Sequence, residues 1–227
     1  LQYHKYCMRT NDELMYNVKD LGLFKITPDS NNQKDLLELT PDYFNLVDSL
    51  SKKVEEKFSS LKNCFIPKDN DPKKEITRRM TDPYQFPELN SLADIIVPQL
   101  ETSLFGCHVH VMGSLIYRNL VVSNPILKTS WLWHYDNHPN EVIKVMIYLN
   151  DVDENTAPFE YFTNSTESSF VKIPPSRTGP ETWFGNPKWP NSRVPDDVLK
   201  KYLEDGPKSK MALGKKGTML IFSQKSF

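Results

Sequence analysis

The sequence lacks the features of secreted, membrane-spanning and nucleic-acid-binding proteins. Its 227 residues include only three cysteines, far apart and odd in number, which argues against a disulfide framework. No apolar run approaches the roughly 18 to 20 residues that a membrane-spanning helix needs, and the opening LQYHKYCMRT does not have the layout of a signal peptide. The chain also has no large net charge, since 28 basic residues nearly balance 29 acidic ones. We therefore predict a soluble cytoplasmic protein that binds neither nucleic acid nor membranes.

The first part of the chain has the apolar spacing of helices. With 38% apolar residues, the chain can bury the core of a single domain spanning 1–227. We expect helices at about 11–21, 41–61 and 88–105, a short strand LFKI after the first helix, and a charged, proline-containing loop at 63–87. Thr40 is placed to cap the second helix, and Gly106 to end the third. Residues 1–106 therefore form the predicted helical part.

After Gly106 the spacing changes to that of β-strands. The β-rich runs are separated by Asn, Pro and Gly, a pattern typical of an antiparallel sandwich or jelly roll. They are VHVMGSLIY, ILKTSWLWH, EVIKVMIYL, PFEYF and GTMLIF. A proline-rich segment at about 164–216, with one expected helix in PDDVLKKYLEDG, interrupts them like a lid. The predicted class is α+β, with helices first and a β-barrel over 107–227.

One pair of residues has the spacing of metal ligands. In SWLWHYD, His134 and Asp136 lie two residues apart, so a strand would project both side chains to one side. An imidazole and a carboxylate, completed by a second histidine, form the facial triad of non-haem Fe(II) oxygenases. We therefore take His134 and Asp136 as candidate iron ligands.

The surrounding sequence resembles the phytanoyl-CoA dioxygenase-like branch of the Fe(II)/2-oxoglutarate oxygenases. The similar stretch is WHYDNHPNEVIKVMIYLNDVDENTAPFEYF, and GKKGTMLIF at 214–222 is similar to the turn and strand before that family's distal histidine. The resemblance implies a double-stranded β-helix (jelly roll, cupin-like) flanked by N-terminal helices, and Fe(II) with 2-oxoglutarate as co-substrate. The family's distal histidine and co-substrate arginine would fall beyond Phe227, so we expect this sequence to be a truncated form of a longer chain.

Further residues are candidates for binding the co-substrate. In EVIKVMIYL, an aliphatic face should pack on the helices and turn Lys144 the other way, where an ammonium needs an anion such as a 2-oxoglutarate carboxylate. Alternatively, this face is exposed and Lys144 is solvated. Tyr117 and Asn119, which share a face with Val111 and Leu115, are further candidates, with core packing as the other role for the tyrosine.

The lid-like segment mixes cationic and aromatic residues that suit an acidic or acyl substrate. They are Arg177, Trp183, Trp189 and Arg193. In the alternative interpretation, the tryptophans only anchor a long loop to the barrel.

Three functions follow from these residues. The first is an Fe(II)- and 2-oxoglutarate-dependent dioxygenase that hydroxylates a small organic or acyl substrate with O2. The second is a catalytically incomplete barrel that binds a ligand or partner. The third is a zinc hydrolase using His108, His110 and His134. The identity of the substrate and the oligomeric state do not follow from the sequence.

Overall fold

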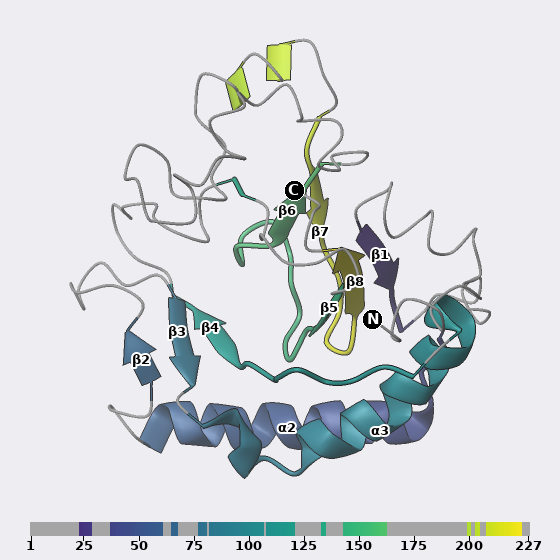
Figure 1. The fold of residues 1–227 in the computed structure, drawn as a ribbon. Coiled ribbons are helices and arrows are strands. Elements are labelled where there is room, and N and C mark those ends of the chain that lie inside the picture. Colours follow the sequence, from purple (N-terminus) through teal and green to yellow (C-terminus); the bar gives the residue numbers. More distant parts are fainter. Residues whose placement is uncertain are drawn as a thin grey trace, which may run out of the picture.

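In the computed structural model, the described residues form two helices and small antiparallel sheets (Figure 1). These residues are 23–28, 37–60, 65–67, 77–80, 82–106, 108–120, 133–134, 143–162, 199–200, 203–204 and 208–223. The two long helices lie side by side as one layer, and the sheets lie over them (Figure 1). The predicted mixture of helices and antiparallel strands is therefore confirmed at this level.

Helix α2 (Pro41–Ser60) begins where the sequence predicts. The backbone N–H of Tyr43 donates to Thr40 Oγ1 at 3.3 Å, so the threonine caps the helix, and Pro41 takes the first position, where a missing N–H costs no bond. The buried stripe follows the helical period. It consists of Tyr43, Val47, Leu50 and Val54. The neighbouring Phe44 is only partly buried.

Helix α3 (Glu88–Leu100) widens at its end into a π-helical turn, η3 (Glu101–Phe105). Pro98 lies inside the helix and has no N–H for the carbonyl four residues earlier, which loosens the regular ladder just before the wider turn. The Gly106 N–H donates to the Glu101 carbonyl at 2.8 Å, and its φ of 61° is left-handed. The predicted end of this helix at Gly106 is confirmed.

The described strands form three small antiparallel sheets. The central sheet has the order β1 (Leu23–Ile26), β8 (Met219–Ser223) and β5 (Ile143–Ile147). The lateral sheet has the order β2 (Phe65–Pro67), β3 (Thr77–Met80) and β4 (Tyr117–Asn119). The covering pair is β6 (Phe159–Tyr161) with β7 (Lys210–Ala212), and an isolated bridge between Val152 and Gly214 lies beyond it.

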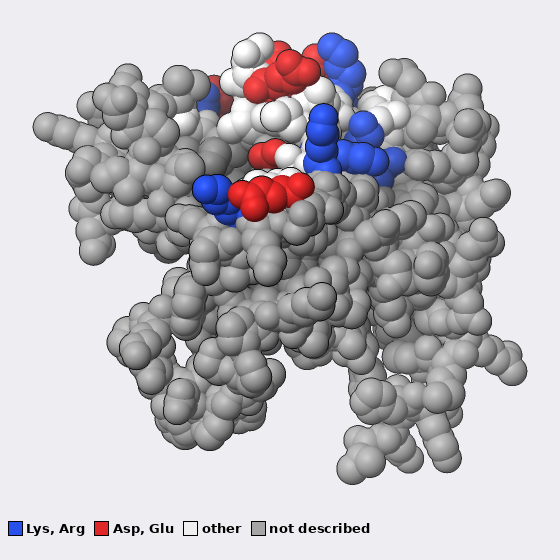
Figure 2. Space-filling view, turned by 90° about the horizontal axis from the view of Figure 1, so that it is seen from above, with Lys and Arg blue, Asp and Glu red and all other residues white. Residues whose placement is uncertain are grey.

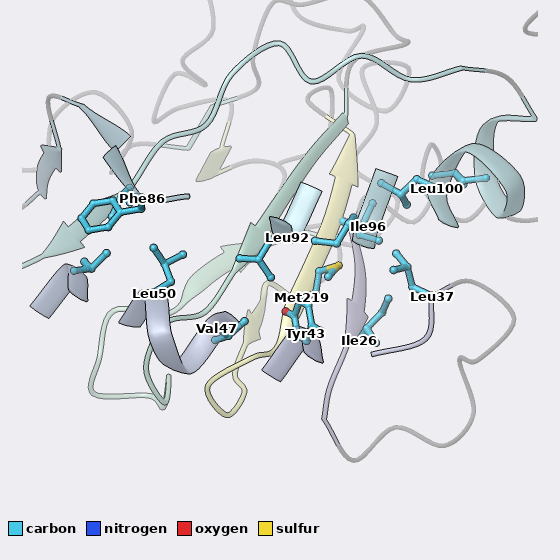
Figure 3. Close-up of a cluster of buried hydrophobic side chains, with 14 of the residues drawn as sticks. Ile26, Leu37, Tyr43, Val47, Leu50, Phe86, Leu92, Ile96, Leu100 and Met219 are labelled. Carbon is cyan, nitrogen blue, oxygen red and sulfur yellow. The ribbon is translucent and has the colours of Figure 1, made fainter. Parts of the chain in front are cut away.

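Side chains from both helices and both three-stranded sheets meet in the main core (Figure 3). Met219 and Ile221 of β8, at the centre of the central sheet, are fully buried in it, and Met80 joins it from the lateral sheet. Hydrogen bonds fix the sheet loops to α2: Tyr43 Oη donates to the Gly217 carbonyl at 2.9 Å, and Ser51 Oγ donates to the Leu149 carbonyl at 2.7 Å. The central sheet is thereby fixed to the helical layer.

Some elements differ from the prediction. Strands β2 and β3, and the 3₁₀ turn η2 (Pro83–Gln85), lie within 63–87, which we expected to be a loop; that part of the prediction was wrong. Of the expected strand VHVMGSLIY, residues 109–116 do not form a strand, and the last residue, Tyr117, begins β4. Strand β7 lies at the end of the segment expected as a lid, where it pairs with β6. The expected helix 11–21 and most of the strand 126–134 lie outside the described residues.

Charged side chains of both signs alternate on the described surface. Figure 2 shows basic and acidic residues side by side over the described part of one face. Ion pairs join Lys215 to Asp151 at 2.8 Å and Arg118 to Glu55 at 3.1 Å. Within the described part of the chain, no helix is both long and apolar enough to cross a membrane.

Candidate functional site

Strand β5 divides the candidate site from the helices. Its aliphatic residues Ile143, Val145 and Ile147 pack against the helical core, whereas Met146 belongs to a second apolar cluster on the other face. Lys144 alternates with the aliphatic set, and its cross-strand partner Phe222 belongs to the second cluster. Lys144 therefore lies on the sheet face away from the helices, as the sequence predicted.

The covering pair packs over that face of the central sheet. The rings of Phe159 and Phe222 lie 4.9 Å apart between centroids. Tyr148 Oη donates to the Ala212 carbonyl at 2.6 Å. Burial raises the pKa of Tyr148 to about 12, so its hydroxyl stays protonated and keeps donating at neutral pH. The two layers are therefore held together by apolar side chains of the second cluster and by this hydrogen bond.

A second lysine lies on the same face. Lys25 of β1 is opposite Leu220, which belongs to the second cluster, and Lys25 Nζ donates to the Leu213 carbonyl at 3.1 Å. The sequence analysis did not single out Lys25, although the alternation in LFKI separates it from Ile26, which is buried among the helices. This hydrogen bond links Leu213, the residue after β7, to the central sheet.

His134 lies beside an aromatic contact that ties its segment to the end of β6. The preceding residue, Trp133, stacks at a tilt on Phe162, with 4.4 Å between ring centroids. Phe162 is almost fully buried, whereas His134 is partly buried. This ring contact fixes the residue before His134 to the end of β6.

Asp136 lies outside the described residues, as do the four residues expected to hold the substrate. Those four are Arg177, Trp183, Trp189 and Arg193. Among the described residues, no three His, Cys, Asp or Glu side chains gather as a group that could hold a metal ion. An imidazole with a carboxylate is nevertheless a donor set that suits Fe(II).

Tyr117 and Asn119 belong to the lateral sheet, whereas Lys144 belongs to the central one. Both are exposed, and Asn119 Oδ1 accepts a hydrogen bond of 3.1 Å from Thr77 Oγ1 of the neighbouring strand. Arg79 of β3 pairs in register with Tyr117. The sequence analysis missed Arg79, because β3 falls in a stretch that we expected to be a loop.

His108 and His110 lie on the surface. The His108 imidazole is 92% exposed, and its Nδ1 lies 2.7 Å from Glu101 Oε1. The same carboxylate oxygen accepts from the Val109 backbone N–H at 2.7 Å. His110 is exposed as well. Glu101 therefore holds the chain as it leaves helix α3.

Comparison with known proteins adds no assignment. No family model matches this chain, and no curated protein matches it.

Proposed function

We propose that this chain is the core of an Fe(II)- and 2-oxoglutarate-dependent dioxygenase with a double-stranded β-helix fold. His134 and Asp136 are the proposed iron ligands, on the basis of their donor chemistry, their spacing and the resemblance of the surrounding stretch. A sheet with helices on one face and a second pair of strands on the other supports the fold. We place the protein in the cytoplasm because of its few, widely spaced cysteines.

The proposal depends on one observation, the position of Lys144 on the face of β5 that points away from the helices. Lys144 lies on the face beneath the covering pair, next to apolar side chains, so a carboxylate bound on that face would meet a cation in apolar surroundings. We assign Lys144 to a 2-oxoglutarate carboxylate, and Tyr117 and Asn119 to further polar contacts with that co-substrate. Bound Fe(II) and 2-oxoglutarate would supply the activation of O2 for hydroxylation of a C–H bond.

The protein's own residues have three further tasks in this proposal. His134 must keep the imidazole nitrogen that faces the metal free of a proton, as every metal-bound histidine does. Asp136 supplies a carboxylate where a small residue would leave room for a halide, which favours hydroxylation over halogenation. The lid residues Arg177, Trp183, Trp189 and Arg193 are assigned to an acidic or acyl substrate. The second histidine and the co-substrate arginine are not assigned to residues of this sequence.

Anaerobic spectroscopy tests the proposal. Adding Fe(II) and 2-oxoglutarate to the full-length protein should give a weak visible charge-transfer band, and oxygen should then turn the co-substrate over to succinate. His134→Ala and Asp136→Ala should each abolish the band. His108→Ala, which removes an exposed imidazole, is the matched control and should keep it. A full-length protein with neither band nor turnover would refute the oxygenase and favour a binding protein on the same scaffold.

A further inference from the structure

The lateral sheet has two chemically different faces. Arg118 of β4 points to helix α2, where its guanidinium donates to Glu55 at 3.1 Å and lies 4.9 Å from the centre of the Phe58 ring. Met80 of β3 is also buried on this side. Because strand residues alternate, Tyr117 must project from the opposite face, away from the helix.

Arg79 lies on that opposite face beside Tyr117. The strand register places Arg79 opposite Tyr117, and Arg78 opposite Arg118. The Arg79 side chain is exposed and makes no hydrogen bond or ion pair with any described side chain. Its guanidinium therefore presents several N–H donors outward from the face that carries Tyr117.

An exposed apolar run leads into this face. Val111 is 44% exposed, Leu115 46% and Tyr117 47%. The segment is held in position all the same, since the Ser114 N–H donates to Tyr84 Oη at 3.1 Å. In Figure 1 it crosses above the helices before entering β4. Single apolar residues on a surface need no explanation, whereas exposed apolar residues that gather on one face indicate a binding site.

We propose that Arg79 and the apolar strip of Val111, Leu115 and Tyr117 bind a small amphiphilic carboxylate. The guanidinium holds the carboxylate through paired N–H donors, and the hydrocarbon lies along Leu115 and the Tyr117 ring, which leaves the Tyr117 hydroxyl for the contact with 2-oxoglutarate. One arginine matches the single negative charge of a carboxylate, whereas a phosphate monoester carries nearly two negative charges. Arg78 and Arg118 do not add to the positive charge of this face, because they lie on the other face of the strands. This assignment rests on the proposed function in that it names the class of substrate, but the binding itself needs no iron.

Calorimetry on the metal-free full-length protein tests the site with decanoate, decyl phosphate and 1-decanol as probes. Decanoate should bind, and Arg79→Met should weaken it at least about tenfold, the loss expected for a charge-assisted hydrogen bond. Arg78→Met removes the same charge from the next residue on the opposite face, and it should leave decanoate affinity unchanged. Leu115→Ser should weaken decanoate severalfold while acetate affinity stays the same.

Other results would overturn the assignment. Decanoate that binds Arg79→Met as tightly as the wild type would do so, as would 1-decanol that binds as tightly as decanoate. Binding of decyl phosphate but not of decanoate would also contradict it. A change of oligomeric state in Leu115→Ser would assign the strip to a second copy of the chain. Decanoate binding through Arg79 without an iron band would retain this site and refute the oxygenase. An iron band without decanoate binding would support the oxygenase and refute this site.

Discussion

At the scale of single residues, Gly214 is constrained by a neighbouring side chain. A Cβ added there would lie 2.4 Å from Thr218 Oγ1 and 2.7 Å from its Cγ2, and Thr218 is fully buried. We expect Gly214→Ala to lower the free energy of unfolding by about 1 to 3 kcal/mol through overpacking, measured by urea denaturation. Gly113→Ala is the control, since its Cβ would meet only Tyr84 Oη, at an ordinary 3.5 Å. Equal losses in both variants would contradict this explanation.

The sequence predicts a residue's face only where a strand pattern is visible. In β5, aliphatic residues alternate with Lys144 and Met146, so the face of Lys144 could be predicted before its partners were known. Arg79 had no such signal, because Thr77, Arg78 and Arg79 show no apolar alternation and follow a charged stretch. Its place depends on pairing with β4, about forty residues away along the chain, and only the fold provides that pairing.

At the scale of elements, a buried carboxylate joins the two helices. Glu88, at the start of α3, accepts from Ser49 Oγ at 2.7 Å and pairs with Lys53, both on α2. The hydrogen bond from Lys53 is the main cause that lowers the pKa of Glu88 below its ordinary value of 4.5. Because the folded pKa is lowered, this contribution to stability is present above about pH 4.5 and is lost as the pH falls through the folded pKa.

Glu88→Gln should therefore cost about 1 to 3 kcal/mol of unfolding free energy at pH 7, since it breaks the ion pair with Lys53 and leaves a neutral amide in a buried position. The difference from the wild type should begin to shrink below about pH 4.5, where the unfolded carboxyl takes up a proton, and should be smallest once the pH is below the lowered folded pKa of Glu88. Urea denaturation between pH 3 and pH 7 measures both effects. Glu56→Gln removes the same charge from an exposed position on α2 and should change stability by less than about 0.5 kcal/mol. A pH-independent loss in Glu88→Gln would contradict a role for the carboxylate charge.

A tyrosine hydroxyl links the central sheet to the covering pair. Tyr148→Phe removes the 2.6 Å bond to the Ala212 carbonyl, and it should cost about 0.5 to 1.5 kcal/mol at pH 7. Burial raises the pKa of Tyr148 to about 12 from its ordinary 10.0, so its contribution is complete below pH 10 and is lost as the pH rises through about 12. Alkaline denaturation should consequently be shallower in Tyr148→Phe. Tyr117→Phe, at a half-exposed ring, should keep the steep wild-type profile.

At the scale of the whole molecule, local signals predict helices well and sheet partners poorly. Helix α2 could be predicted because its cap, its proline and its apolar period all lie within the helix. The central sheet joins β1 to β8 across most of the chain, and no local pattern in LFKI identifies MLIFS as its partner. Short strands such as β2 and β7 depend on their neighbours for stability, so their sequences carry little periodic signal. The candidate site shares this limit, because its residues come from separate strands.

The two apolar clusters lie on opposite faces of one sheet, so we expect them to unfold together. Ile221 faces the helices and Leu220 faces the covering pair, and both are fully buried in the central strand β8. Ile221→Ala and Leu220→Ala should each lower the free energy of unfolding by about 2 to 5 kcal/mol. Because β8 belongs to both clusters, each variant should retain a single transition with the same urea midpoint by circular dichroism and by tryptophan fluorescence. If Leu220→Ala separated those two midpoints, the helical layer and the covered face would be independent units, and the single domain would have to be abandoned.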